Sequence, residues 1–199
     1  MDTGSSSFGL AATNGTLWVG ATETGELLRI DTAARAITAR VAVGRAVLDV
    51  CATPEAVWAI STLDGTVTRV DAKTNAVTNV VEVGERPYAC TWAFGHLWVS
   101  NGRSGTLSQV DGDGRVVATV ELGGEPNGVA GHGNRIYVAG DLWVPCIESD
   151  SIDVIDTATG ARRYSLAASK GPIMACRAAQ SVWVACWAST SLVRVPIAA

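Results

Sequence analysis

Residues 56–71 read AVWAISTLDGTVTRVD and contain the pattern that decides the fold. A short apolar run centred on Trp58 is followed by a polar turn that contains Gly65, and then by an alternating strand that ends in Asp71. Short runs rich in β-branched and aromatic residues, bounded by turn residues, predict strands. The stretch therefore predicts two neighbouring antiparallel strands.

The same pattern recurs along the chain with a period near forty residues. Its aromatic markers, separated by 40, 40, 39 and 46 residues, are Trp18, Trp58, Trp98, Tyr137 and Trp183. The carboxylates that close the pattern are Asp31, Asp71, Asp111 and Asp156. Repeats of this length, made of several short strands, are typical of β-propeller blades, each of which is a four-stranded sheet. In the second copy we expect strands A to D at about 48–53, 56–62, 65–71 and 77–83.

The repeat predicts one all-β domain, a β-propeller of about five blades, over residues 8–199. We expect the blades at about 8–47, 48–87, 88–126, 127–171 and 172–199, the last of them incomplete because it lacks strand D. Residues 1–7 are expected to be a disordered or trimmed segment. Three forms of closure stay open: a five-bladed ring with a three-stranded last blade, a piece of a longer propeller, or a homo-oligomer that pairs through the uncovered strand edge.

The composition excludes two classes of partner. The 199 residues are 48% hydrophobic, carry a net charge of −4 and include two lysines, Lys73 and Lys170. A surface for nucleic acid or anionic lipid needs clustered positive charge, so we expect neither partner. The sequence contains no run of about twenty apolar residues, so we do not expect membrane insertion. We expect a soluble domain whose compartment is unknown, extracytoplasmic if a leader precedes it.

The repeated aspartates point to turns and not to metal. An aspartate that ends a strand accepts hydrogen bonds from its own turn, which explains a carboxylate in every copy without an ion. The stretch Asp111-Gly112-Asp113-Gly114 also lacks the bidentate glutamate of a calcium loop. The segment Asp2-Thr3-Gly4-Ser5-Ser6 is similar to an aspartic protease turn, but the chain has no second such motif. We expect no metal and no cofactor.

Several segments resemble a known repeat: Leu17-Trp18-Val19-Gly20, Gly65-Thr66-Val67-Thr68-Arg69-Val70-Asp71, Val83-Gly84-Glu85-Arg86-Pro87 and Leu97-Trp98-Val99-Ser100-Asn101. They are similar to the YVTN-type bacterial β-propellers, a superfamily that includes the streptogramin lyase-like propellers. The resemblance implies the propeller fold. It implies no single function, since members serve as sensor domains, as binding modules and occasionally as enzymes.

The lyase branch can be weighed on its motifs. Its blades resemble Trp-Phe-Thr-Glu, and its chemistry uses a histidine and a glutamate near a magnesium ion. Here Trp18 is followed by Val-Gly-Ala, and the other copies also lack that glutamate. The histidines, His96 and His132, fall in A-to-B turns on the face opposite the expected ligand site. We therefore expect a non-catalytic binding or sensor propeller, with a lyase-like enzyme as the alternative.

Blade geometry predicts where a ligand would bind. Strands alternate in direction, so the D-to-A connections and the B-to-C turns emerge on one face, which we call the loop face. The polar and aromatic residues that we expect there are Glu23, Arg45, Asp64, Glu85, Arg86, Arg103, Glu125, Asn127, Lys170 and Trp187. Mixed charge suits a small polar molecule, a peptide or a protein. The alternative, that these are ordinary solvated loop charges, stays open.

Residues 140–150 are predicted to be an insertion between strands B and C of the fourth blade. This segment carries Trp143, and it forms either a pocket wall or a contact with the neighbouring blade. On the inner strands, Asp49 and Arg177 are candidates around the channel, and an enzyme would use them there. The predicted ligand-binding residues, none of them assigned a catalytic role, are Asp49, Arg103, Asn127, Trp143, Arg177 and Trp187.

The five cysteines cannot all pair within one chain. Buried small hydrophobic side chains are the default interpretation. In an oxidising compartment, Cys146 with Cys176 or Cys186 is the pairing that we would test.

Overall fold

The computed structural model describes residues 2–122, 136–138, 141–178 and 181–196, and the side chains of residues 136–138, 141, 173–174 and 176–178 lie outside this description. The described residues form nineteen strands in five antiparallel sheets. This architecture confirms the prediction of an all-β propeller repeat with a three-stranded last unit. No helix long and apolar enough to span a membrane occurs in the described part of the chain.

Each sheet follows the chain from an inner strand to an outer one. The first sheet contains β1 (Ser7–Thr13), β2 (Thr16–Ala21), β3 (Glu26–Asp31) and β4 (Ala36–Ala42). The second contains β5 (Val47–Ala52), β6 (Ala56–Ser61), β7 (Thr66–Asp71) and β8 (Val77–Glu82). The third contains β9 (Pro87–Ala93), β10 (His96–Asn101), β11 (Thr106–Val110) and β12 (Val116–Glu121). The strands of the second sheet begin and end within about one residue of the predicted positions.

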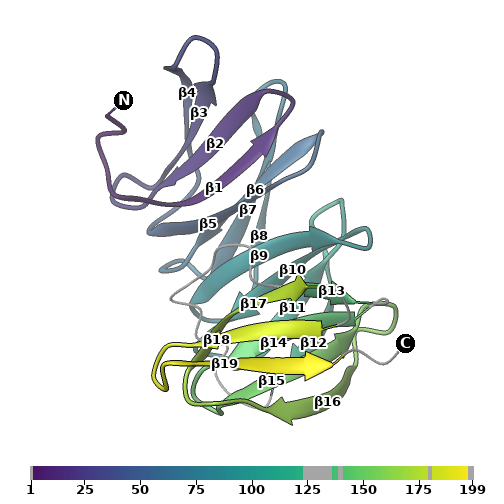
Figure 1. Ribbon diagram of the computed structural model, residues 1–199. Helices are drawn as coiled ribbons and strands as arrows, with labels where there is room; N and C mark the ends of the chain where they lie inside the picture. The colour runs from purple at the N-terminus through teal and green to yellow at the C-terminus, as the bar shows by residue number, and fades with distance from the viewer. Residues whose placement is uncertain (1, 123–135, 139–140, 179–180, 197–199) are drawn as a thin grey trace.

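The last two sheets have the same order. The fourth contains β13 (Ile136–Val138), β14 (Asp141–Cys146), β15 (Ser151–Asp156) and β16 (Arg162–Ala167). The fifth contains β17 (Pro172–Ala178), β18 (Ser181–Cys186) and β19 (Ser191–Pro196). Figure 1 shows the first and last sheets apart, with the second and third sheets between them. The five sheets therefore form an open arc and not a closed five-bladed ring.

Tryptophans fill the spaces between neighbouring sheets. Trp18 packs with residues of the second sheet, Trp58 with residues of the third, and Trp98 with residues of the fourth. Trp143 packs in the same way against the fifth sheet. Burying side chains of this size is the main stabilising contribution in such a fold, because each removes a large apolar area from water. The repeat thus marks the positions that hold one sheet to the next.

The structure corrects the predicted course of the fourth repeat. Trp143 lies on the second strand of its sheet, β14, and is the true counterpart of Trp98, whereas Tyr137 lies on the inner strand β13. Residues 141–146 are therefore strand and not an inserted loop, and the turn that follows has ordinary length. The extra residues precede β13, between Glu121 and Ile136. The prediction was wrong because Tyr137 and Trp143, which are six positions apart, both fit the aromatic position of the repeat.

The closing aspartates bind their own turns. One carboxylate oxygen of Asp71 accepts backbone hydrogen bonds from Lys73 at 2.9 Å and Thr74 at 2.7 Å. The same arrangement occurs at Asp31, Asp111 and Asp156. These bonds confirm the interpretation of the aspartates as turn caps.

Candidate ligand-binding site

The loop face is built from two backbone segments per sheet that bind each other. The amide of Thr62 in the β6–β7 turn donates to the carbonyl of Ala46 in the β4–β5 connection at 3.1 Å. In the third sheet, Gly102 donates to Arg86 at 2.9 Å, and in the fifth sheet Trp187 donates to Gly171 at 3.0 Å. Backbone hydrogen bonds of this kind fix the turns to each other, so the loop face is a preformed surface.

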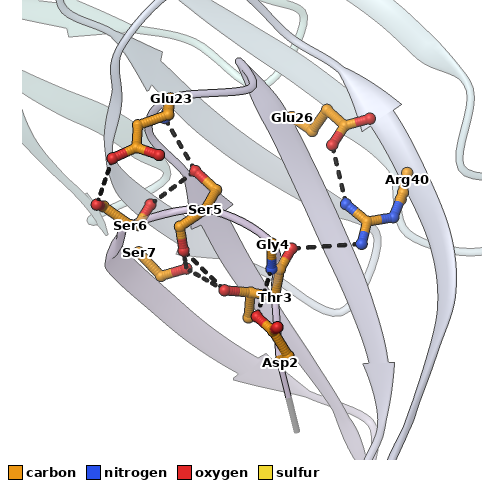
Figure 2. Close-up of polar contacts among 9 residues, drawn as sticks. All are labelled: Asp2, Thr3, Gly4, Ser5, Ser6, Ser7, Glu23, Glu26 and Arg40. Atoms are coloured by element: carbon orange, nitrogen blue, oxygen red, sulfur yellow. Dashed lines mark hydrogen bonds and ion pairs between the residues drawn. The ribbon is translucent and has the colours of Figure 1, made fainter.

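The segment that precedes β1 repeats this arrangement, because Thr22 donates its amide to the carbonyl of Ser6 at 2.8 Å. Figure 2 shows a second bond of this segment, in which the hydroxyl of Ser6 donates to Glu23 at 2.6 Å. The carboxylate of Asp2 accepts the amide of Gly4 at 2.9 Å, so it caps a local turn. We expected residues 1–7 to be a disordered or trimmed segment. In the structure, residues 2–6 form these hydrogen bonds within the segment and with the first sheet.

A small cavity on the loop face lies between the second and third sheets. It has a volume of about 260 Å³ and is lined by Thr62, Leu63, Asp64, Gly65, Glu85, Arg86 and Arg103. We call it the loop-face pocket. The β6–β7 turn, the β8–β9 connection and the β10–β11 turn supply these residues, so three separate segments of the chain meet there.

The charges of the pocket differ in how firmly they are held. Arg45 donates to Asp64 twice, from its side chain at 2.6 Å and from its backbone at 2.7 Å. The backbone bond first, and then the guanidinium, lower the pKa of the Asp64 carboxyl. Arg103 lies 3.3 Å from Glu85, and both side chains are about 70% exposed, at 68% and 71%. An exposed pair of this kind contributes little to stability, so both groups are available to a ligand.

Arg86 differs from the other charges of the pocket. Its backbone has a φ of 49°, a left-handed conformation that is uncommon for a residue with a side chain. The guanidinium forms no ion pair with any described residue. The turn therefore presents an exposed positive charge at the pocket, next to the ion pair of Glu85 and Arg103.

The predicted site residues divide between this face and the interior. Arg103 lines the loop-face pocket, and Trp187 lies on the same face in the fifth sheet with 66% of its surface exposed. Asn127 lies outside the described residues. Arg177 is part of β17, where its backbone pairs with Val182, and its side chain is outside the description.

Asp49 and Trp143 lie in the interior. Asp49 is 4% exposed, and its carboxylate accepts the amides of Val50 and Cys90, each at 2.9 Å. This bridge joins the inner strands β5 and β9. Trp143 is 3% exposed within the core between the fourth and fifth sheets, so its ring does not line the loop face.

Sequence reasoning missed three residues of the pocket, Thr62, Leu63 and Gly65. Thr62 is buried and donates its hydroxyl to the carbonyl of Pro87 at 2.7 Å, which joins the second sheet to the third. Leu63 is exposed at the tip of its turn. An apolar residue at the centre of a polar turn was the signal that could have identified Leu63.

Among the side chains that the structure describes, the cysteines and possible metal ligands add no second centre on this face. Cys146 and Cys186 are free thiols, so the proposed pairing of these two does not occur in the structure. Burial raises the pKa of Cys146 to about 12, and the negative charge of Asp153 adds to this effect. Across the described residues, no three His, Cys, Asp or Glu side chains gather closely enough to hold a metal ion.

A family model described as a repeat of unknown function, DUF6923, matches residues 2–114. The chain belongs to the DUF6923 family. The matched part of this DUF6923 chain extends from the segment before β1 to the turn between β11 and β12, so it contains every residue of the loop-face pocket. A search of curated proteins by sequence finds no match.

Solved structures share the fold at low sequence identity. The structure of hydrazine synthase from Kuenenia stuttgartiensis is 15% identical and has a TM-score of 0.72. The match covers 96% of this chain and 66% of the hydrazine synthase chain. A catalytically inactive virginiamycin B lyase from Staphylococcus aureus, solved with quinupristin, is 15% identical and has a TM-score of 0.74. The match covers 92% of this chain and 64% of the lyase chain.

A chain of a mitotic checkpoint complex, at 13% identity, has a TM-score of 0.79 and coverages of 100% and 69%. The DUF6923 chain therefore spans about two thirds of the length of these structures. At these identities the matches, which include virginiamycin B and streptogramin B lyases, establish a β-propeller fold and nothing about activity.

Proposed function

We propose that this chain is a non-catalytic binding propeller that holds a polar molecule or a segment of another protein in the loop-face pocket. The exposed guanidinium of Arg86, beside the ion pair of Arg103 and Glu85, is the observation that supports this proposal most directly. A partner with a carboxylate would bind the two arginines, since guanidinium groups match carboxylates in a two-pronged geometry.

The pocket suits a peptide better than a simple anion. Asp64 and Glu85 place negative charge beside the two arginines, so a ligand with both charges complements the whole site. The exposed side chain of Leu63 adds an apolar contact. Because the turns are already fixed by backbone hydrogen bonds, binding costs little ordering of the protein.

The related folds support both a scaffold and an enzyme. The checkpoint-complex chain belongs to a protein assembly, which favours a protein partner. The virginiamycin and streptogramin B lyases favour the second candidate, a lyase-like enzyme that acts on a small molecule at the channel mouth. Self-association through β19, which pairs only with β18 among the described strands, stays a prediction.

Binding can be tested with a library of short peptides that differ only in charge: acidic, basic, zwitterionic and neutral. We expect saturable binding that weakens about tenfold or more in Arg86→Ala and in Arg103→Ala, because each loses a charge-assisted hydrogen bond. Arg115→Ala, which removes an exposed arginine at a β11–β12 turn on the opposite face, is the matched control.

Two results would count against the proposal. Equal affinities in all three variants would remove the loop-face pocket from the binding site. Conversion of quinupristin to a new mass on incubation with the chain would instead support the lyase-like alternative. Thermal unfolding of each variant should stay within about 0.5 kcal/mol of the parent, as is usual for exposed substitutions.

A further inference from the structure

The face opposite the loop face has a larger cavity, between the second and third sheets. Its volume is about 510 Å³, and its lining includes Cys51, Pro54, Glu55, Trp58, Arg69 and Trp92. We call it the tryptophan wedge. It shares Cys51, Ala52 and Thr91 with a hollow of about 540 Å³ along the inner strands β1, β5 and β9. The wedge is therefore continuous with the channel side of the propeller and separate from the loop-face pocket.

Trp92 has no tryptophan counterpart in the other repeats. The residue six positions before the core tryptophan is Ala12 in the first sheet and Ala52 in the second. In the third sheet it is Trp92, which is half-buried and whose ring lies 6.2 Å from the ring of Trp58 at an interplanar angle of 17°. Among the first three sheets, only the third therefore places a large aromatic ring at this position, where the first two sheets carry alanine.

Arg69 supplies a positive charge to the same space. Its guanidinium carbon lies 5.6 Å from the centre of the Trp58 ring, and one terminal nitrogen donates to the hydroxyl of Thr78 at 2.8 Å. Its Nε is buried without a hydrogen-bond acceptor, and the same is true of the indole nitrogen of Trp58, which is 1% exposed. Arg69 forms no ion pair with a described residue.

The last sheet contains an equivalent arginine over a tryptophan ring, and there the Nε donor of the arginine has an acceptor. There Arg194 lies 5.9 Å from the centre of the Trp183 ring, and its Nε donates to the hydroxyl of Ser181 at 2.8 Å. The corresponding donor of Arg69 has no such partner within its own sheet. A buried donor left without an acceptor costs free energy, so Arg69 is not satisfied within its sheet as Arg194 is, and an anionic group in the cavity that Arg69 lines is favoured.

We propose that the tryptophan wedge binds a planar aromatic carboxylate, with the ring against Trp92 and the carboxylate near Arg69. Stacking on an indole suits a flat ring, and a guanidinium that forms no ion pair with a described residue suits a carboxylate. Pro54 and Ala52 supply the apolar part of the wall. The volume lies within the range of small-molecule sites. Glu55 is exposed in the lining, so a second negative charge on the ligand is disfavoured.

Gly112 offers a way to block the wedge without disturbing the core. A Cβ at this position would make only an ordinary contact, 3.7 Å from the ring of Trp92, and the backbone of Gly112 is not left-handed. Gly112→Leu therefore places a side chain beside Trp92 while leaving Arg69 and Trp58 intact. Arg69→Gln removes the charge and keeps most of the side chain over Trp58.

The test is calorimetric titration of the whole chain with cinnamate and indole-3-carboxylate, and with methyl cinnamate as the neutral control. We expect saturable binding of the two acids and at least about tenfold weaker binding of the ester. Gly112→Leu and Arg69→Gln should each weaken acid binding about tenfold or more. Arg29→Gln, which changes the equivalent arginine of the first sheet, and Arg86→Ala, on the loop face, should leave it unchanged.

The proposal is overturned if neither acid binds the parent chain, or if the acids bind equally well to Gly112→Leu. Equal binding of acid and ester would also overturn it, since the charge of Arg69 would then have no role. Because the loop-face pocket is separate, loss of peptide binding in Arg86→Ala with intact cinnamate binding supports both sites independently. Thermal unfolding of Gly112→Leu confirms that any loss of binding comes from a folded protein.

Discussion

Gly9 on β1 is a position where a small substitution should have a large effect on stability. A Cβ at residue 9 would lie 2.5 Å from the Cα of Asp49 and 2.6 Å from the backbone nitrogen of Val50. Carbon atoms in contact lie about 3.5–4.0 Å apart, so β1 and β5 would have to separate by about 1 Å. Both contacts are with backbone atoms, and no flexible side chain can give way.

We expect Gly9→Ala to destabilise the fold by about 3 kcal/mol, at the upper end of the range for overpacked cores. For a chain of this size that corresponds to a fall in the melting temperature of about 6–12 °C. The assay is urea unfolding followed by tryptophan fluorescence, with the melting temperature as a second measure.

The matched control is Gly112→Ala, where the added Cβ meets only the ring of Trp92 at an ordinary distance. This variant should be neutral or slightly stabilised, because alanine reduces the conformational entropy of the unfolded chain. If Gly9→Ala unfolds at the same urea concentration as Gly112→Ala, the close approach of β1 to β5 is not a constraint on the fold, and the reasoning is wrong.

Three further perturbations follow from the contacts of single groups. Asp49→Asn should cost about 2–4 kcal/mol in urea unfolding, because the side-chain amide of asparagine cannot accept from both Val50 and Cys90, and an unchanged unfolding midpoint would contradict this bridging role. Iodoacetamide at pH 8 should modify half-buried Cys51 before Cys146, whose pKa is raised to about 12, and peptide mass mapping that finds Cys146 modified first would contradict this order. The pKa of Asp156 is lowered first by the Arg163 side chain and then by its own turn, so its stabilising effect is present above the unfolded value of about 3.9 and is lost as the pH falls through the lower folded value. Asp156→Asn should therefore show a smaller loss of stability between pH 5 and pH 2 than the parent in urea titrations, and an equal loss would refute the assignment.

Much of the fold could be predicted because the repeat is local. Strand lengths, turn aspartates and the spacing of Trp18, Trp58 and Trp98 are properties of neighbouring residues, so the sheets and their edges follow from the pattern. The same locality caused the error in the fourth sheet. Tyr137 and Trp143 both satisfy the aromatic position, and only strand pairing decides which residue faces the next sheet.

The candidate site was harder to predict, because it depends on which turns meet. The sequence placed Arg103 and Arg86 on the loop face from strand direction alone, and the structure brings both to one pocket. It could not separate a ligand-facing aspartate from one that joins two strands. Asp49 is a buried bridge because the amide of Cys90, 41 residues further along the chain, lies within hydrogen-bond distance.

By itself, then, the sequence of this DUF6923 chain determined a repeating antiparallel sheet with tryptophans at its interfaces and aspartates at its turns. The tertiary structure alone decided what lies between the sheets: the bridge from Asp49 to Cys90, the stacking of Trp92 on Trp58, and the position of Arg69 beside that stack. The physical reason is the distance along the chain between the residues that make contact. Periodicity reports contacts within one sheet, whereas cavities and bridges form where residues forty positions apart approach each other.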